Sequence, residues 1–330
     1  MKQTNQQIDG SINIIGDGSI GHLLAGYLLR SGHSVSLYSH SDKPSRTVTL
    51  VAPESAFNFK FTTQTEALTQ IRTRSLTIIA AKAHQFEGIS QQLSQLAYKP
   101  SCILLMMNGL GLLEIAERWL PSVAVYQAST TQAAKLTVDS KTNHTTLEHT
   151  GYGETLIGDF NLQTQLSKAG SHTDRNPINS LIETLDLALP PVSWSNNHHQ
   201  NLWFKLFINA IINPLTAIND VANGALIDDP VTNATAQQLT QDLSPLLQQL
   251  LPELTWQTLF SKILDVASAT AKNSSSMRQD IKLGRKTEID FITGYILKKA
   301  QKFGCSLSSH QQLYQQVKGL ENQTQTSVTK

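Results

Sequence analysis

"INIIGDGSIGHLLAGYLLRSGHSVSLYSHS", residues 12–41, decides the fold class of the N-terminal half of this chain. INII is typical of a buried β-strand, GHLLAGYLLRSG of a helix that ends at Gly32, and SVSLYS of a second strand. Between the first strand and the helix, Gly16, Gly18 and Gly21 have the spacing GxGxxG. That spacing alone is weak evidence, because glycines are common in turns. The order strand, loop, helix, strand gives it a mechanism and predicts a dinucleotide-binding turn.

Each residue of this turn has a part in the prediction. Gly16 allows the tight turn, Gly18 lets a pyrophosphate approach the backbone, and Gly21 lets the helix pack closely on the strand. The helix N-terminus, which begins with Ser19 and Ile20, then faces the phosphates, because its free N–H groups and its dipole favour an anion there. We assign these five residues to cofactor binding.

The residues after the second strand bear on which dinucleotide is bound. An NAD-binding site places an acid about 20 residues past the glycines. Here the strand ends at Ser39 and His40, followed by Asp42, Lys43 and Arg46. The basic residues suit a 2′-phosphate and favour NADP, although an ordinary charged loop would look the same.

Three further apolar runs, LTIIAA, CILLMM and VAVY, have the length and composition of buried parallel strands. Alternating with helical patterns, they predict an α/β domain with a Rossmann-type parallel sheet. LEHTGYGETLIGDF, residues 147–160, predicts a hairpin that adds antiparallel strands. Lys82 and Asn108 follow two of the buried strands, at the carboxyl ends where such sheets bind ligands.

The C-terminal part has helical patterns and no convincing strand. We therefore predict two domains, residues 1–196 for dinucleotide binding and residues 197–330 as an all-helical substrate and catalytic domain. The last ten residues, ENQTQTSVTK, are polar and predict a loose tail.

Composition excludes some classes of partner. Net charge is +1 and charged residues make up 15% of the chain, so no basic field is present to bind nucleic acid or an anionic membrane. Two cysteines cannot form a disulfide framework, and MKQTNQQIDG has no apolar signal core, so we expect a cytoplasmic protein. His198 and His199 are adjacent, lack the spacing of zinc ligands and predict a solvated turn, so no metal site is expected.

One polar stripe stands out in the helical region. In NLWFKLFINAIINPLTAI, residues 201–218, Lys205, Asn209 and Asn213 lie four residues apart on one side of an otherwise apolar helix. Such a helix is buried, and a buried lysine needs a partner. Glu288 is the obvious one, because on a helix through residues 289–296 it shares a face with apolar residues.

A lysine ammonium held in this way suits one kind of chemistry. Hydride arriving at a ketone carbon creates negative charge on the oxygen, which a cation can stabilise and protonate. Lys205 fits that role, and Glu288 would orient it. The alternatives are that Lys205 extends its ammonium to water and that Glu288 only stabilises the first turn of its helix. Ser276, in SMRQ, has the spacing of a capping box and predicts a helix start.

Together, the glycine loop, NGLG, LWFKLFINAIINPLTAI, NGAL and SSSMRQDIKLGRKTEID resemble the ketopantoate reductase family over most of the chain. The resemblance implies NADPH-dependent reduction of 2-dehydropantoate to (R)-pantoate in pantothenate biosynthesis, with an active site between a Rossmann-type domain and a helical one. It implies that Lys205 is the general acid and that Glu288 belongs to the same catalytic site. Residues implied to bind substrate are Asn108, Asn209, Asn213, Asn223 and Ser276, and Lys82, Asn108 and Glu288 are implied to lie at the cofactor.

Two residues depart from the family pattern. His40 stands where an arginine often binds the 2′-phosphate, and Asp17 stands in the glycine loop where a small or neutral residue is usual. The sequence also leaves open an NADP-dependent reductase of another branched 2-oxo acid, a non-enzymatic dinucleotide-binding sensor, and either a monomer or a homodimer.

Overall fold

The computed structural model describes residues 11–39, 46–52, 57–63, 65–66, 68, 71, 75–97, 99–139, 144–159 and 176–328. The chain divides into two compact units. Unit 1 comprises Met1–Met107 and Leu112–His199, and unit 2 comprises Asn108–Gly111 and Gln200–Lys330. The short segment Asn108–Gly111 therefore belongs with the helical unit, although it follows a strand of the other unit. The predicted single boundary between residues 196 and 197 had placed this segment in the N-terminal domain.

Unit 1 is built on an eight-stranded sheet, which confirms the predicted α/β class. Its central strands are parallel, since each is hydrogen-bonded in parallel to its neighbour from β8 (Ala124–Thr130) to β5 (Thr65–Glu66). The strand order is β12(Val192–Trp194)-β11(Thr155–Gly158)-β8(Ala124–Thr130)-β7(Cys102–Leu105)-β6(Leu76–Ile79)-β1(Ser11–Ile15)-β2(Ser34–Tyr38)-β5(Thr65–Glu66). All residues of β6 and β7 are buried, as their continuous apolar sequences require.

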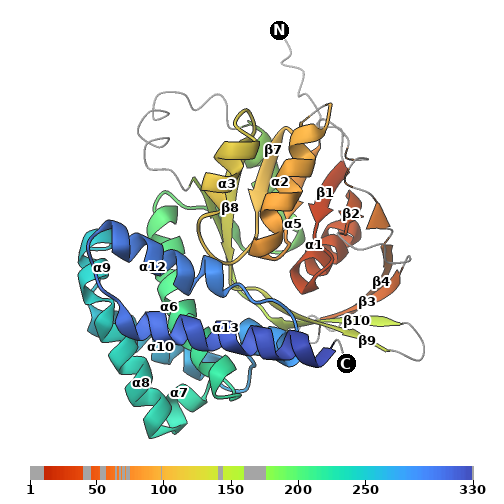
Figure 1. Cartoon of the computed structure of the whole chain (residues 1–330). Coiled ribbons are helices and arrows are strands. Elements are labelled where there is room, and N and C mark those ends of the chain that lie inside the picture. Colours follow the sequence, from red (N-terminus) through yellow and green to blue (C-terminus); the bar gives the residue numbers. More distant parts are fainter. Residues whose placement is uncertain are drawn as a thin grey trace. The chain divides into compact units, whose positions relative to one another are not determined.

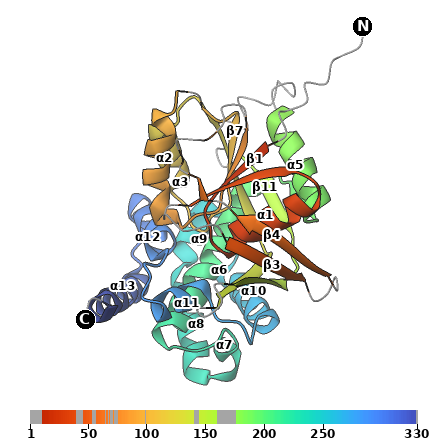
Figure 2. The same cartoon turned by 90° about the vertical axis from the view of Figure 1, so that its right-hand side faces the viewer.

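Helices cover both faces of this sheet (Figure 2). On one face lie α2 (Phe86–Gln95) and α3 (Leu112–Trp119), and on the other α1 (Ser19–Arg30) and α5 (Asn176–Ala188). Every residue of α1 from Gly21 to Leu28 is buried, which is unusual for a helix that covers only one sheet. Its other side packs against a second sheet.

This second sheet was not predicted from the sequence. Its order is β4(Phe57–Thr63)-β3(Arg46–Ala52)-β10(Thr145–Gly151)-β9(Ala133–Val138). It packs on α1 at Gly26, where an added Cβ would lie 3.0 Å from both Leu50 Cδ2 and Phe61 Cε1. A glycine at this position therefore lets the helix approach the sheet closely.

The predicted hairpin at residues 147–160 is wrong. β10 pairs with β3 and β9 in the second sheet, whereas β11 pairs with β8 and β12 in the large sheet. The ladder of β10 is irregular between His149 and Gly151, just before the chain leaves the second sheet. Both strands of this stretch do have an antiparallel neighbour, β9 for β10 and β8 for β11, but they do not pair with each other.

In unit 2, residues 200–328 are all described and form helices and connecting turns, with no strand. The longest apolar helix, α6 (His198–Ile218), buries Trp203, Phe207 and Ile211 to 1% exposure or less. The last helix, α13 (Ser308–Val328), includes residues 321–328, so the predicted loose tail is wrong for these residues (Figure 1). The elements are α6(His198–Ile218), α7(Ala225–Asp228), α8(Pro230–Asp242), α9(Ser244–Leu250), α10(Trp256–Ala269), α11(Ser276–Lys282), η4(Ile289–Phe291), α12(Thr293–Lys302) and α13(Ser308–Val328).

In the part of the chain described, no helix combines the length and the apolar character needed to cross a membrane.

Candidate active site

The glycine loop has the geometry that its sequence predicts. Gly16 has a φ of +121°, and an added Cβ there would lie 2.6 Å from the carbonyl of Ala80 at the end of β6. An added Cβ at Gly21 would lie 1.9 Å from the carbonyl oxygen of Gly16, so α1 packs directly on the turn. Gly18 is exposed and would meet nothing within 4 Å. The loop is closed on the side of the sheet and open at Gly18.

The N-terminus of α1 can bind an anion at this open position. Gly18 is the N-cap and provides no side-chain hydrogen bond, and its carbonyl accepts from the N–H of His22. The N–H groups of Ser19, Ile20 and Gly21 precede the first donor of the helical ladder and have no acceptor within α1. These residues fit the pyrophosphate of a dinucleotide, which needs backbone donors and room for close approach.

The predicted contacts to a 2′-phosphate lie outside the described residues. β2 ends at Tyr38 and the description stops at Ser39, so His40, Asp42 and Lys43 are not included. Arg46 begins β3, but its side chain is not described. The preference for NADP therefore stays a prediction.

Lys82 follows β6 at the carboxyl edge of the large sheet. It is partly buried and is the N-cap of the short 3₁₀ helix η3, Ala83–Gln85. Its backbone N–H donates to Gln85 Oε1 at 3.1 Å. This places Lys82 after the strand that borders the glycine loop, since β6 pairs with β1.

Lys205 lies on α6 among the buried aromatic residues of unit 2. The indole of Trp203 packs against the rings of Phe207 and Tyr295, at centroid distances of 5.5 and 5.7 Å, and so joins α6 to α12. Burial lowers the pKa of the Lys205 ammonium from 10.5 to about 8, while the nearby Glu288 carboxylate opposes that shift. The structure thus brings the two predicted partners into electrostatic contact.

Glu288 is 5% exposed and precedes a 3₁₀ turn. The sequence predicted one helix through residues 289–296, and this is wrong. The turn η4 ends at Phe291, and α12 begins at Thr293. Between them stands Ile292, whose φ of −104° and ψ of −90° are not helical. The side chain of Glu288 is nevertheless buried, as predicted, because its segment packs inside unit 2 rather than along one helix face.

The segment Asn108–Gly111 places the side-chain amide of Asn108 next to the carboxylate of Glu288. Asn108 Nδ2 donates to Glu288 Oε2 at 3.5 Å, and Leu110 N donates to Phe291 O at 2.9 Å. Gly109 has a φ of +90°, and a Cβ there would lie 2.6 Å from Phe291 Cβ. The glycine in NGLG is therefore required for a close approach of this loop to η4.

The asparagines of the stripe stand one and two turns along α6 from Lys205, at about 6 Å per step. Asn209 is partly buried and Asn213 is 8% exposed. The helix continues through Pro214 to Ile218, although a proline cannot donate to the carbonyl of Ala210.

Asn223 is the residue whose hydrogen bonding points most directly to a ligand. It is 8% exposed, and its Nδ2 donates to Thr270 Oγ1 at 2.9 Å. Its Oδ1 is buried and accepts no hydrogen bond from any residue that the structure describes. A buried amide oxygen without a donor is costly, and a hydroxyl or ammonium group of a ligand would satisfy it.

The predicted capping role of Ser276 is wrong. The N-cap of α11 is Ser275, whose hydroxyl accepts from the N–H of Arg278 at 3.1 Å and from Thr216 Oγ1 at 2.7 Å. Ser275 is buried, whereas Ser276 is the exposed first residue of the helix. Three serines are adjacent at residues 274–276, so the sequence alone does not show which of them is the N-cap. Because Ser275 is the N-cap, the Ser276 hydroxyl is available to a ligand.

His198 is fully buried at the start of α6, contrary to the prediction that it is solvated. A Cβ added to Gly158 would lie 2.4 Å from His198 Cβ, so the imidazole packs on β11. Within the described ranges, no three His, Cys, Asp or Glu side chains are grouped as metal ligands would be.

Comparison with known proteins gives matches along nearly the whole chain. Residues 12–161 match the family described as ketopantoate reductase PanE/ApbA, and residues 197–321 match the C-terminal family of the same description. The 2-dehydropantoate 2-reductase of Vibrio cholerae serotype O1 is 34% identical over 312 residues, which are 94% of this chain and 98% of that one. That of Bacillus subtilis (strain 168) is 28% identical over 318 residues, 95% and 98% of the two chains.

Solved structures have the same fold. The crystal structure of a probable 2-dehydropantoate 2-reductase from Bacillus subtilis has a TM-score of 0.68 and 26% identity, covering 94% of this chain and 99% of that one. The ternary structure of D-mandelate dehydrogenase with NADH and anilino(oxo)acetate has a TM-score of 0.79 at 20% identity, covering 95% and 99%.

Proposed function

The chain belongs to the ketopantoate reductase PanE/ApbA family of oxidoreductases, and from this premise we propose that it reduces 2-dehydropantoate to (R)-pantoate with NADPH, a step of pantothenate biosynthesis. The observation that carries the proposal is the partly buried Lys205, with its lowered pKa, beside Glu288. A 2-oxo acid is the class of substrate that this pair suits.

Lys205 acts in this proposal on the carbonyl oxygen. When bound, the reduced nicotinamide supplies a hydride to the carbonyl carbon. The ammonium stabilises the negative charge that develops on the oxygen and donates its proton there. A pKa of about 8 suits this task, because the group is still mainly protonated at neutral pH but is a stronger acid than a solvated lysine.

Glu288 and Asn108 hold that ammonium in the charged state. The Glu288 carboxylate raises the pKa of Lys205 against the effect of burial. Asn108 donates to the same carboxylate, which limits its rotation. Without Glu288, the ammonium would lose its proton at lower pH and could no longer act as an acid.

The substrate offers a carboxylate, a 2-oxo group and a hydroxyl. We assign Asn209, Asn213 and Ser276 to its polar groups, because amides and hydroxyls can both donate and accept. Asn223 Oδ1 would accept from the substrate hydroxyl, which satisfies the buried oxygen that lacks a donor.

For the cofactor, we propose that the turn of Gly16, Gly18 and Gly21 receives the pyrophosphate at α1. His40 and Lys82 would lie nearer the two ends of the dinucleotide. The charges of Lys43 and Arg46 support a 2′-phosphate and hence NADPH over NADH.

A substrate and cofactor comparison tests the proposal. We expect the protein to oxidise NADPH only when 2-dehydropantoate is added, with a higher kcat/KM than for the 2-oxo acid that corresponds to mandelate. We also expect a higher kcat/KM with NADPH than with NADH. Faster turnover of another 2-oxo acid would assign that substrate instead, and binding of NADPH without any turnover would identify a sensor.

A further inference from the structure

A buried carboxylate on the C-terminal helix holds the residue next to Glu288. Glu321, on α13, is 3% exposed. Its Oε1 accepts from both the N–H and the hydroxyl of Thr287, each at 2.7 Å, and its Oε2 pairs with Lys318 Nζ at 2.6 Å. Because both oxygens are satisfied, the cost of burying this charge is offset locally.

The same hydrogen bonds reach both sides of Glu288. Thr287 is 1% exposed, and while its hydroxyl donates to Glu321 it accepts from the N–H of Ile289 at 3.2 Å. The backbone N–H groups before and after Glu288 are thus joined to one hydroxyl and one carboxylate. The peptide that carries Glu288 cannot rotate without breaking these bonds.

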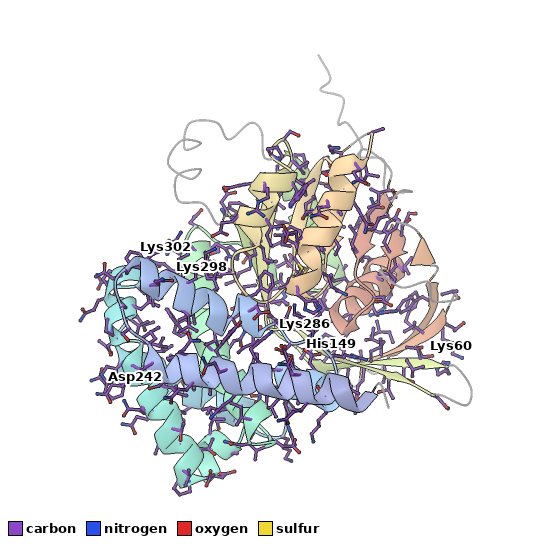
Figure 3. All side chains as sticks on the ribbon, in the orientation of Figure 1. Lys60, His149, Asp242, Lys286, Lys298 and Lys302 are labelled. Carbon is purple, nitrogen blue, oxygen red and sulfur yellow. The ribbon has the colours of Figure 1, made fainter. Side chains whose placement is uncertain are left out.

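Asp290 gives the segment a second attachment to α13. Its carboxylate accepts from the Tyr314 hydroxyl at 2.6 Å and from Lys318 Nζ at 3.3 Å, and Lys286 Nζ lies 3.9 Å away (Lys286 is labelled in Figure 3). Burial and the neighbouring Asp290 raise the pKa of Tyr314 to about 12, so its hydroxyl remains a donor. Lys318 contacts both Asp290 and Glu321 and links the two attachments.

We propose that Glu321 is a positioning residue for the reaction, which acts through Thr287 to hold the Glu288 carboxylate at the Lys205 ammonium. The inference rests on the function proposed above. It assigns to α13 a role in catalysis although none of its residues was expected to take part.

Positioning explains this arrangement better than stability alone. A buried ion pair adds little net stability, and apolar residues of similar volume commonly replace one without loss. Here the charged groups surround the one segment that carries the proposed partner of Lys205. Misplacement of a catalytic group by about 1 Å can lower the rate as much as 100-fold. Hydrogen bonds that hold Glu288 in place would therefore preserve the rate of the reaction.

Two substitutions at Thr287 test the inference. Thr287→Val keeps the shape of the side chain and removes only the hydroxyl, whereas Thr287→Ser keeps the hydroxyl. We expect Thr287→Val to lower kcat roughly 10-fold, within the loss that such misplacement can cause. Thr287→Ser should restore a value near that of the wild type.

The pH dependence of kcat/KM separates positioning from stability. The charged group that faces Lys205 is Glu288, and those that face Glu321 are Lys318 and, through it, Asp290. If Glu288 moves away, the pKa of Lys205 falls, and the loss of kcat/KM at high pH should begin at a lower pH. Glu288→Gln should produce the same displacement more strongly, and Glu321→Gln should resemble Thr287→Val. Asp265→Asn, at an exposed ion pair of α10, serves as the unaffected control.

The outcomes distinguish the two proposals. If Glu288→Gln displaces the pH dependence but Thr287→Val and Glu321→Gln change only the melting temperature, the positioning role is overturned and the proposed function stands. If Glu288→Gln itself leaves both kcat and the pH dependence unchanged, Glu288 has no part in the mechanism and the positioning role is overturned. The proposed function fails only if the wild type does not reduce 2-dehydropantoate with NADPH.

Discussion

Replacing Lys205 with alanine is expected to lower kcat by about 100- to 10,000-fold, the usual contribution of a positioned proton donor. The substitution removes both the proton and the cation that stabilises the developing negative charge on the substrate oxygen. It also leaves Glu288, 5% exposed, as a buried carboxylate without its counter-charge. The affinity for NADPH should change little, because the glycine loop is a separate part of the chain. Steady-state kinetics and NADPH titration measure the two effects.

A matched control is available on the surface of the same unit. Lys262 is an exposed lysine of α10, paired with Asp265 at 3.2 Å. Lys262→Ala should keep the kcat of the wild type, since exposed ion pairs contribute little. Equal turnover by the wild type and by Lys205→Ala would remove Lys205 from the mechanism.

The second large effect is expected at the glycine loop. In Gly21→Ala the new Cβ would lie 1.9 Å from the carbonyl oxygen of Gly16, and a backbone atom cannot move aside as a flexible side chain can. Either the turn opens or α1 shifts, at a cost of about 1 to 3 kcal/mol. If that strain falls on the binding-competent turn, affinity for the dinucleotide should fall roughly 10- to 100-fold. Isothermal titration with NADPH measures this loss.

Gly88→Ala is the control for this substitution. Gly88 lies in α2, where an added Cβ would meet nothing within 4 Å. It should bind NADPH like the wild type and melt at the same or a slightly higher temperature, because alanine favours a helix. NADPH affinity of Gly21→Ala equal to that of Gly88→Ala would show that the turn is not the phosphate site.

Five strands of the large sheet, β1, β2, β6, β7 and β8, could be predicted because each is a local signal in the sequence. The strands β5 and β12 were not predicted, because they have only two and three residues. β6 and β7 are short apolar runs that only a buried strand explains. The second sheet could not, because it pairs segments nearly one hundred residues apart, as in Val48 opposite Thr145. Its strands are rich in threonine, and no local pattern says which strands pair. For the same reason β10 and β11 resembled a hairpin, although they belong to different sheets.

The candidate site could be predicted where a charge had to be buried. Lys205 and Glu288 stand among apolar residues, so their types and positions alone required a partner. The attachment of Asn108–Gly111 to η4 depends on contacts between residues about 180 positions apart in the sequence, and no local pattern predicts such contacts. Glu321 was missed because its sequence neighbours, ENQTQTSVTK, are polar and give no sign of burial. Residues such as Ser275 show the limit of cap rules when several serines are adjacent.

The most direct test of the account is the pH dependence of kcat/KM for the reduction of 2-dehydropantoate, which reports ionisation of the free enzyme. Lys205 must be protonated to act, and its pKa is about 8. We therefore predict that kcat/KM is constant at neutral pH, falls tenfold per pH unit above about pH 8, and falls from a lower pH in Glu288→Gln, which lacks the charge that raises this pKa. A wild-type kcat/KM that stays constant from pH 7 to about pH 10, the range of an ordinary lysine, would contradict the account.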